Sequence, residues 1–210
     1  MKKVLIICIF LIIFSGCVYN EEPLPRISQK QSFKKLDLPE SPRIQSVIKS
    51  AGIEQSWIPP GRLERSWTAI VIHHSGTKSG NSAIFDRWHR EGNHWEGVGY
   101  DFVIGNGSNS GDGEVEVTFR WREQKTGAHC GGTRGNWANR EAVGVCLVGN
   151  FNQTAPTRRQ MQSLAKLIRF LQGRYGIEKS RIYGHNSTPG AHKTDCPGKR
   201  FPMARLKSML

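Results

Sequence analysis

Apolar positions along the chain form short continuous runs separated by polar and glycine-rich stretches. A run with apolar residues at both odd and even positions is typical of a strand that is buried on both faces. The segments "WTAIVIHH" and "AVGVCLVGNF" have this character. Shorter runs indicate further strands, and the glycine-rich "NGSNSGDG" is suited to a hairpin loop between two of them. The predicted strands cover residues 67–74, 98–105, 114–119, 142–151 and 180–185.

The clearest helical pattern lies in residues 157–175, where apolar positions recur with the period of an amphipathic helix. Thr157 and Gln160 have the spacing of a capping box, and Gly176 is suited to end the helix. Three more helices are predicted, over residues 41–52, from Asn81 or Ser82 to Gly92, and over residues 202–210.

Strands that alternate with helices predict the class of fold. We expect a single α/β domain over residues 41–210, with a mixed central β-sheet flanked by helices. The preceding segment, residues 17–40, contains three prolines and many charged residues without any period. Such a composition is typical of a flexible tether.

Residues 1–16 are predicted to be an export signal, because Lys2 and Lys3 precede an apolar run over residues 4–14. As a helix this run would measure about 16 Å, roughly half of a bilayer core. The following "FSGC" resembles the lipobox of bacterial lipoproteins, which implies that Cys17 becomes the lipidated first residue. The alternative is an ordinary cleaved signal. The resemblance implies a lipid-anchored protein of the cell envelope, on the periplasmic face of the outer membrane in a Gram-negative host.

The net charge of the chain indicates which class of partner the protein binds. The chain carries 30 Lys and Arg against 17 Asp and Glu, a formal charge of +13, and loss of the two signal lysines lowers it to +11. A basic exported protein is suited to an anionic partner, such as a cell-wall polymer, lipopolysaccharide or phospholipid headgroups. Basic residues form no runs interleaved with aromatics, so we expect no nucleic-acid partner.

Candidate metal ligands stand where predicted buried strands end. His73 and His74 close one strand, His185 closes another, and Cys196 follows in a loop rich in turn residues. Strand ends hold side chains rigidly while the adjoining loops leave them accessible. Two imidazoles and one thiolate form a three-ligand set for Zn²⁺ with a fourth position open. The alternative is a buried free thiol with two polar histidines nearby.

Seven short motifs together resemble one known family. In chain order they are "IVIHHSG", "GVGYDFVI", "GDGEVEV", "TGAHCGG", "AVGVCLVGNF", "YGHN" and "TDCPGKRF". Their order and spacing, over about residues 55–208, resemble the type 2 amidase family. That family includes phage lysozymes with amidase activity, the peptidoglycan recognition proteins and bacterial N-acetylmuramoyl-L-alanine amidases. The resemblance implies their fold, a catalytic zinc, and cleavage of the lactyl-amide bond between N-acetylmuramic acid and L-alanine in peptidoglycan.

The resemblance also implies the ligand set. The family's zinc ligands correspond to His73, His185 and Cys196, with Asp195 as a competing position for the third. Adjacent strand residues point to opposite faces, so one strand ordinarily supplies one ligand. We therefore expect His74 to pack or to support the site without binding metal.

Three further residues correspond to family positions that act on substrate. The hydroxyls of Tyr100 and Thr194 are expected to stabilise the oxyanion that forms when the amide carbonyl is attacked. For Tyr100 the alternative is an ordinary packed strand tyrosine. His129 corresponds to a substrate-contacting position. Cys146 departs from members that carry Glu there, so the general base is unassigned, and a disulfide or packed thiols are both open for Cys146 and Cys130.

Two other function classes are alternatives to a zinc amidase. One is a non-catalytic peptidoglycan-binding module, and the other is a zinc peptidase acting within the stem peptide. The presence of a complete ligand set favours an enzyme. We expect a monomer that acts on peptidoglycan or muropeptides and is held at a membrane through the lipid on Cys17.

Overall fold

The computed structural model describes residues 54–60 and 64–210, all of which belong to the unit Glu40–Leu210. The predicted signal (1–16), the tether (17–40) with Cys17, and the helix over 41–52 lie outside the described residues. Within the described part, no helix combines the length and apolar character needed to span a bilayer.

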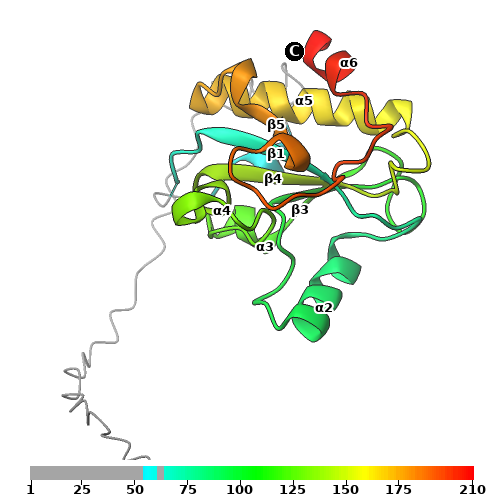
Figure 1. Cartoon of the computed structure of the whole chain (residues 1–210), viewed down its shortest axis with the longest axis horizontal. Helices are drawn as coiled ribbons and strands as arrows, with labels where there is room; N and C mark the ends of the chain where they lie inside the picture. Colours follow the sequence, from blue (N-terminus) through cyan, green and yellow to red (C-terminus); the bar gives the residue numbers. More distant parts are fainter. Residues whose placement is uncertain (1–53, 61–63) are drawn as a thin grey trace, which may run out of the picture. The chain divides into compact units, whose positions relative to one another are not determined.

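A five-stranded mixed sheet forms the centre of the fold (Figure 1), as the sequence predicts. The strand order is β3-β2-β4-β1-β5. Neighbouring strands are parallel except for the antiparallel hairpin of β2 and β3, which is closed by the predicted glycine-rich loop. The strands are β1 (Ala69–His74), β2 (Phe102–Ile104), β3 (Val115–Val117), β4 (Ala142–Leu147) and β5 (Ile182–Gly184).

One face of the sheet packs against helix α5 (Arg158–Tyr175), which runs along it in Figure 1. Thr157 and Gln160 form the predicted capping box, and Gly176 closes the helix with a φ of 67°. Ile70 and Ile72 of β1 pack in the same apolar cluster as residues of α5. The C-terminal helix α6 (Met203–Ser208) adds Leu206 to this cluster.

The opposite face is covered by shorter elements. Helix α2 (Ser82–Asn93) contributes Phe85 to an apolar cluster with Val103 and Cys146, and α4 (Trp137–Glu141) contributes Ala138 to another with Val71. Asn81 caps α2 by accepting from the Ile84 N–H at 2.8 Å. This face therefore has several small clusters in place of one large one.

The structure differs from the sequence prediction around residues 114–119, which were expected to be one strand. Strand β3 ends at Val117, and helix α3 (Phe119–Arg122) begins two residues later. The Thr118 hydroxyl causes the change, because it accepts from the Arg120 N–H and so caps a helix. Helix α4 was also not predicted, since five residues are too few to show a period. Single 3₁₀ turns cover Gln55–Trp57 (η1), Arg134–Asn136 (η2), Lys179–Arg181 (η3) and His185–Ser187 (η4).

Candidate metal centre and active site

Two neighbouring parallel strands and one loop bring together the three predicted ligands. His73 lies near the end of β1, His185 follows β5 directly in η4, and Cys196 lies in the loop beyond. Because β1 and β5 are parallel neighbours, their carboxyl ends lie at the same edge of the sheet. One ligand atom from each residue lies within 4.8 Å of the others. This spacing is compatible with a single ion bound between them.

His73 and His74 lie on opposite faces, as strand geometry requires. His73 is buried beside Tyr100 and His185, with ring centroids 5.3 and 4.7 Å away. The His74 ring instead packs on Phe151 and accepts from the Phe151 N–H at 3.0 Å. His74 still supports the cluster through its backbone.

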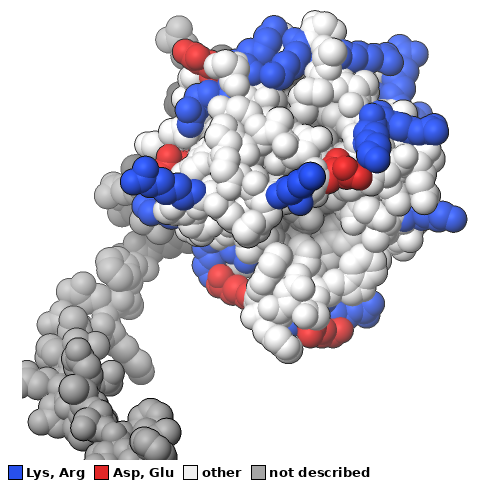
Figure 2. Space-filling model, in the orientation of Figure 1, with Lys and Arg blue, Asp and Glu red and all other residues white. Residues whose placement is uncertain are grey.

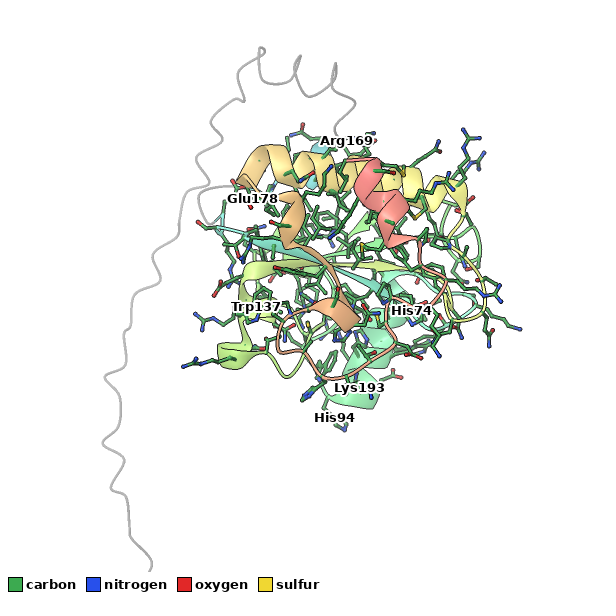
Figure 3. The ribbon with its side chains drawn as sticks, turned by 45° about the horizontal axis from the view of Figure 1, so that its top comes forward. His74, His94, Trp137, Arg169, Glu178 and Lys193 are labelled. Carbon is green, nitrogen blue, oxygen red and sulfur yellow. The ribbon has the colours of Figure 1, made fainter. Side chains whose placement is uncertain are left out.

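The backbone N–H of His74 points at the Cys196 sulfur at 3.4 Å, and His74 lies beside the loop that carries this cysteine (Figure 3). The Asn186 N–H donates to the Cys196 carbonyl at 2.7 Å, which ties the loop to η4. Asp195, the competing ligand position, is exposed, lies 3.7 Å from Lys199 and is not part of the cluster. The geometry therefore favours Cys196 over Asp195.

The protonation states of the two histidines are compatible with binding a metal cation. Burial lowers the pKa of His185, and burial with the neighbouring His129 and His185 holds the pKa of His73 well below its usual value. Both imidazoles are therefore neutral near pH 7, as metal binding requires. The His185 Nε2 atom is buried and has no hydrogen-bond partner among the described residues. A soft thiol and two imidazoles form a donor set suited to zinc.

The thiol must lose its proton when metal binds. Burial raises the pKa of Cys196 to about 12, although the His74 N–H opposes this rise. A coordinating thiol is deprotonated, so metal binding at neutral pH would release a proton from Cys196.

The two predicted oxyanion donors lie around this cluster. Burial, followed by the nearby thiols of Cys146 and Cys196, raises the pKa of Tyr100 well above its usual value, so the phenol keeps its proton for donation. The Thr194 hydroxyl accepts from the Cys196 N–H at 3.1 Å. Its own proton is not used in that bond.

His129 was expected to contact substrate, but its ring is buried among other protein groups. It is 7% exposed, its Nδ1 lies 3.1 Å from His73 Nε2, and its Nε2 lies 3.3 Å from the Ala142 carbonyl oxygen. Both ring nitrogens are thus engaged within the protein. A substrate contact stays a prediction, and the burial of the ring argues against it. No sequence pattern indicated the contact with His73, because 56 residues separate the two histidines.

All three cysteines of the described part are free thiols, which leaves no disulfide there. Cys130 and Cys146 pack in two different apolar clusters. Cys146 lies opposite His73 in the β1–β4 register. Burial raises its pKa well above the usual value, so Cys146 is a neutral thiol and not a general base.

The sequence profile of the N-acetylmuramoyl-L-alanine amidase family (Amidase_2) matches residues 63–199, which is more than half of the chain. The chain belongs to this family. The endolysin of Escherichia phage T7 is 36% identical to this amidase-family chain over 144 residues, covering 65% of the chain and 83% of the endolysin. A peptidoglycan recognition protein of Trichoplusia ni is 25% identical over 151 residues, which cover 66% of this chain and 73% of that protein.

Solved structures of the family share the fold. The amidase LysC of Clostridium intestinale superposes with a TM-score of 0.58 at 29% identity, covering 74% of this chain and 93% of LysC. A point mutant of Drosophila PGRP-LB, solved in complex with tracheal cytotoxin, gives a TM-score of 0.52 at 22% identity. The superposition covers 77% of this chain and 91% of PGRP-LB. At that identity the second likeness shows the fold alone.

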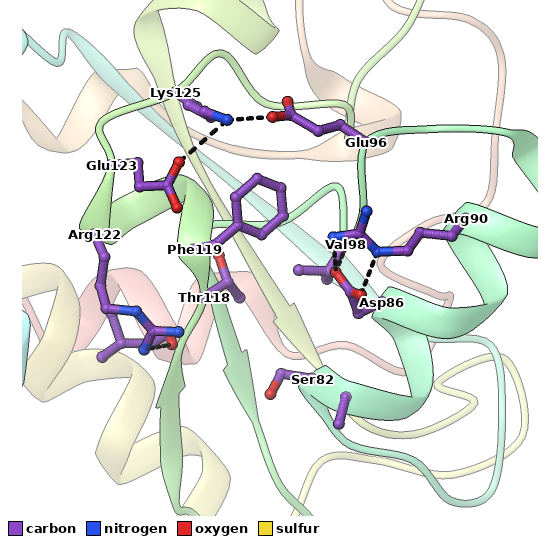
Figure 4. Close-up of a pocket in the computed structure, with 12 residues that line it drawn as sticks. Ser82, Asp86, Arg90, Glu96, Val98, Thr118, Phe119, Arg122, Glu123 and Lys125 are labelled. Atoms are coloured by element: carbon purple, nitrogen blue, oxygen red, sulfur yellow. Dashed lines mark hydrogen bonds and ion pairs between the residues drawn. The ribbon is translucent and has the colours of Figure 1, made fainter. Parts of the chain in front are cut away.

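A hollow of about 590 Å³ lies between α2 and α3 (Figure 4), and no member of the metal cluster lines it. Phe119 is one of its lining residues, and most of the charged side chains that line it pair with one another. Arg90 pairs with Asp86, while Lys125 pairs with Glu96 and Glu123. These charged groups are already paired within the protein, so we place the candidate active site of this amidase-family protein at the histidine–cysteine cluster.

Proposed function

We propose that the protein is a zinc-dependent N-acetylmuramoyl-L-alanine amidase. The observation that carries this proposal is the cluster of His73, His185 and Cys196, in a chain that belongs to an amidase family. The cluster would supply three protein ligands, which is the number typical of catalytic zinc sites that keep a further position for water or substrate. The proposed reaction is hydrolysis of the amide between the lactyl group of N-acetylmuramic acid and L-alanine.

Each residue has a distinct part in this reaction. His73, His185 and Cys196 would hold the zinc, which when bound would supply a Lewis acid for the amide carbonyl and for water. Tyr100 donates a hydrogen bond from its phenol to the carbonyl oxygen as negative charge develops there. Thr194 is a second donor, because its oxygen already accepts from Cys196 and its own proton is free to turn toward substrate. His74 holds the Cys196 sulfur from the backbone side.

Relatives and surface charge support the proposed substrate class. The family profile is named for N-acetylmuramoyl-L-alanine amidase, and the relatives include an endolysin and peptidoglycan recognition proteins. Lys and Arg side chains are spread around the face drawn in Figure 2, with few acidic side chains among them. A basic surface suits an anionic cell-wall polymer, and its attraction should weaken with added salt.

Digestion of purified sacculi tests the reaction directly. Mass spectrometry should find stem peptides that begin with a free L-alanine amine, together with glycan strands that have lost their peptides. Chelator should abolish both products, and Zn²⁺ should restore them. Products cut within the stem would instead show a zinc peptidase, and wall binding without products would show a binding module.

We further propose that the protein acts as a monomer anchored in the cell envelope through a lipid on Cys17, facing the periplasm in a Gram-negative host. The "FSGC" sequence motivates this proposal. Wild type should fractionate with membranes, whereas Cys17→Ser should be released or stay unprocessed. Equal recovery of both proteins in the soluble fraction would contradict the anchor.

A further inference from the structure

We infer that His129 is a positioning residue that fixes the tautomer of His73, so that the Nδ1 atom of His73 faces the metal. This inference rests on the proposed zinc site. It assigns to His129 a role that the expected substrate contact does not include. The evidence is a chain of contacts that runs from Cys196 through both imidazoles to a backbone carbonyl.

The contacts have a definite order. The Cys196 sulfur lies 3.6 Å from His73 Nδ1, on the side of the cluster. On the opposite side of the same ring, His73 Nε2 lies 3.1 Å from His129 Nδ1. The far nitrogen of His129, Nε2, lies 3.3 Å from the carbonyl oxygen of Ala142 in β4. Each imidazole therefore uses its two nitrogens on two different partners.

The Ala142 carbonyl, at the end of this series of contacts, determines which nitrogen of each histidine carries the proton. A carbonyl oxygen only accepts, so the proton of neutral His129 lies on Nε2 and its Nδ1 carries a lone pair. That lone pair accepts from His73, so the His73 proton lies on Nε2. His73 Nδ1 is then deprotonated and directs its lone pair toward Cys196, where the ion would bind. Partners of this kind set which nitrogen of a ligating histidine carries metal.

Two glycines and one asparagine hold the His129 ring in this position. A Cβ atom on Gly144 of β4 would lie 2.4 Å from the ring, and one on Gly127 would lie 2.6 Å from it, so glycine at both positions leaves room for the imidazole. Asn139 of α4 fixes the adjoining backbone, because its Oδ1 accepts from the N–H groups of His129 and Cys130 at 2.8 Å each. The ring is held by sterics and by hydrogen bonds together.

Loss of the His129 acceptor has a defined consequence. The buried Nε2–H of His73 would lose its partner, and His73 could then exchange its tautomer or rotate away from the cluster. Removing an outer partner of a ligating histidine typically weakens metal binding about 10–100-fold. The contact with His73 also explains the burial of a polar ring against a sheet.

Nitrogen NMR of the zinc-loaded wild-type protein tests the tautomer without any substitution. Long-range ¹⁵N–¹H correlations should show His73 with a metal-bound Nδ1 and a protonated Nε2. They should show His129 free of metal and protonated at Nε2. A metal-bound Nε2 on His73, or a proton on Nδ1 of His129, would overturn the inference.

Zinc affinity, measured by competition with a chelating dye, tests the acceptor. His129→Phe keeps a ring but offers no acceptor, and should bind zinc about 10–100-fold more weakly than wild type. His129→Asn can place its side-chain oxygen near the former Nδ1 and should recover part of that loss. His89→Phe is the matched control, because His89 is half-buried with its Nδ1 accepting from the Gly99 N–H and is not in the cluster. Thermal melting of the metal-free variants checks that each is folded.

The outcomes separate this inference from the proposed function. A wild-type protein without zinc affinity would refute the zinc site itself. Tight zinc binding by wild type and equally tight binding by His129→Phe would refute the role of His129 alone. Equal weakening in His129→Phe and His129→Asn would assign the loss to packing and would also overturn the inference.

Discussion

The side chains on the two faces of strand β1 differ in kind and in role. Toward α5, Ile70 and Ile72 pack in a large cluster of buried apolar side chains. Toward the other face, Val71 packs with small residues, and His73 contacts other polar rings. The first face is filled by large apolar side chains, whereas the second combines small apolar clusters with polar side chains that contact one another. We infer that stability depends mainly on the α5 face and chemistry mainly on the other.

The difference has a physical cause. Apolar packing is non-directional, so large side chains on the α5 face can fill space in any close-packed arrangement. A buried polar group must instead find a partner with suitable geometry. On the site face, Gly144 makes room for one such partner, the His129 ring, at the expense of apolar contact area. Substitutions on the two faces should therefore have separable effects.

The largest effect is expected from Cys196→Ala, which removes one ligand of the site face. Two imidazoles cannot hold zinc as the complete set does, so bound zinc and amidase activity should both be lost. Elemental analysis and sacculus digestion measure these losses, and circular dichroism should show an intact fold. Asp195→Ala is the matched control and should keep zinc, because Asp195 is exposed and not in the cluster. Full zinc content in Cys196→Ala would contradict the ligand assignment.

On the α5 face, Leu164→Ala should have the opposite profile. Leu164 is fully buried, so its truncation should lower the free energy of unfolding by about 2–5 kcal/mol. Zinc affinity of the folded protein should not change, since Leu164 belongs to the cluster on the other side of the sheet. Urea unfolding measures the first effect, with Gln162→Ala at an exposed position of α5 as the control. A large loss of zinc affinity in Leu164→Ala would show that the two faces are coupled.

Tyr100→Phe should reduce turnover while leaving zinc and wall binding intact. A donor that meets charge only in the transition state affects kcat most, and loss of one such donor costs about 10²–10³-fold, or about 3–4 kcal/mol. Steady-state hydrolysis of muropeptides measures the loss. Thr194→Ala should cost less turnover, and part of its loss should come from the released Cys196 N–H. Wild-type turnover in Tyr100→Phe would leave Tyr100 as a packed tyrosine.

A last expected effect is a pH dependence of stability that comes from Asp101. Burial raises the pKa of this carboxyl from 3.8 to about 7, even though it accepts from the Gly144 N–H. The folded protein therefore binds more protons than the unfolded chain between about pH 4 and 7, and this contribution to stability is lost as pH rises through that window. The slope is about 1.4 kcal/mol per pH unit in the middle of the window.

Asp101→Asn keeps an acceptor for Gly144 but does not titrate. The variant should resemble wild type near pH 4 and become the more stable protein as pH approaches 8. Urea unfolding at a series of pH values measures the difference between the two proteins. A difference that is independent of pH would contradict a raised pKa at Asp101.

Much of the fold could be predicted from sequence because its signals are local. The capping box of Thr157 and Gln160, the period of the helix they begin, and Gly176 at its end all lie within 20 residues. The buried strands β1 and β4 stand out as apolar runs. Helices α3 and α4 could not be predicted, because four or five residues carry no periodic pattern and a single capping hydroxyl at Thr118 decided where β3 gave way to α3.

The sequence by itself determined the strands, the long helix, the family and the three candidate ligands, because strand ends, turn residues and ordered motifs are properties of neighbouring residues. Only the tertiary structure decided which partners those ligands have. His129 is 56 residues from His73, and the Cys196 sulfur is contacted by a backbone N–H from 122 residues earlier in the chain. Such contacts follow from the pairing of β1 with β4 and β5. They depend on directions and distances in space, for which separation along the chain is no guide.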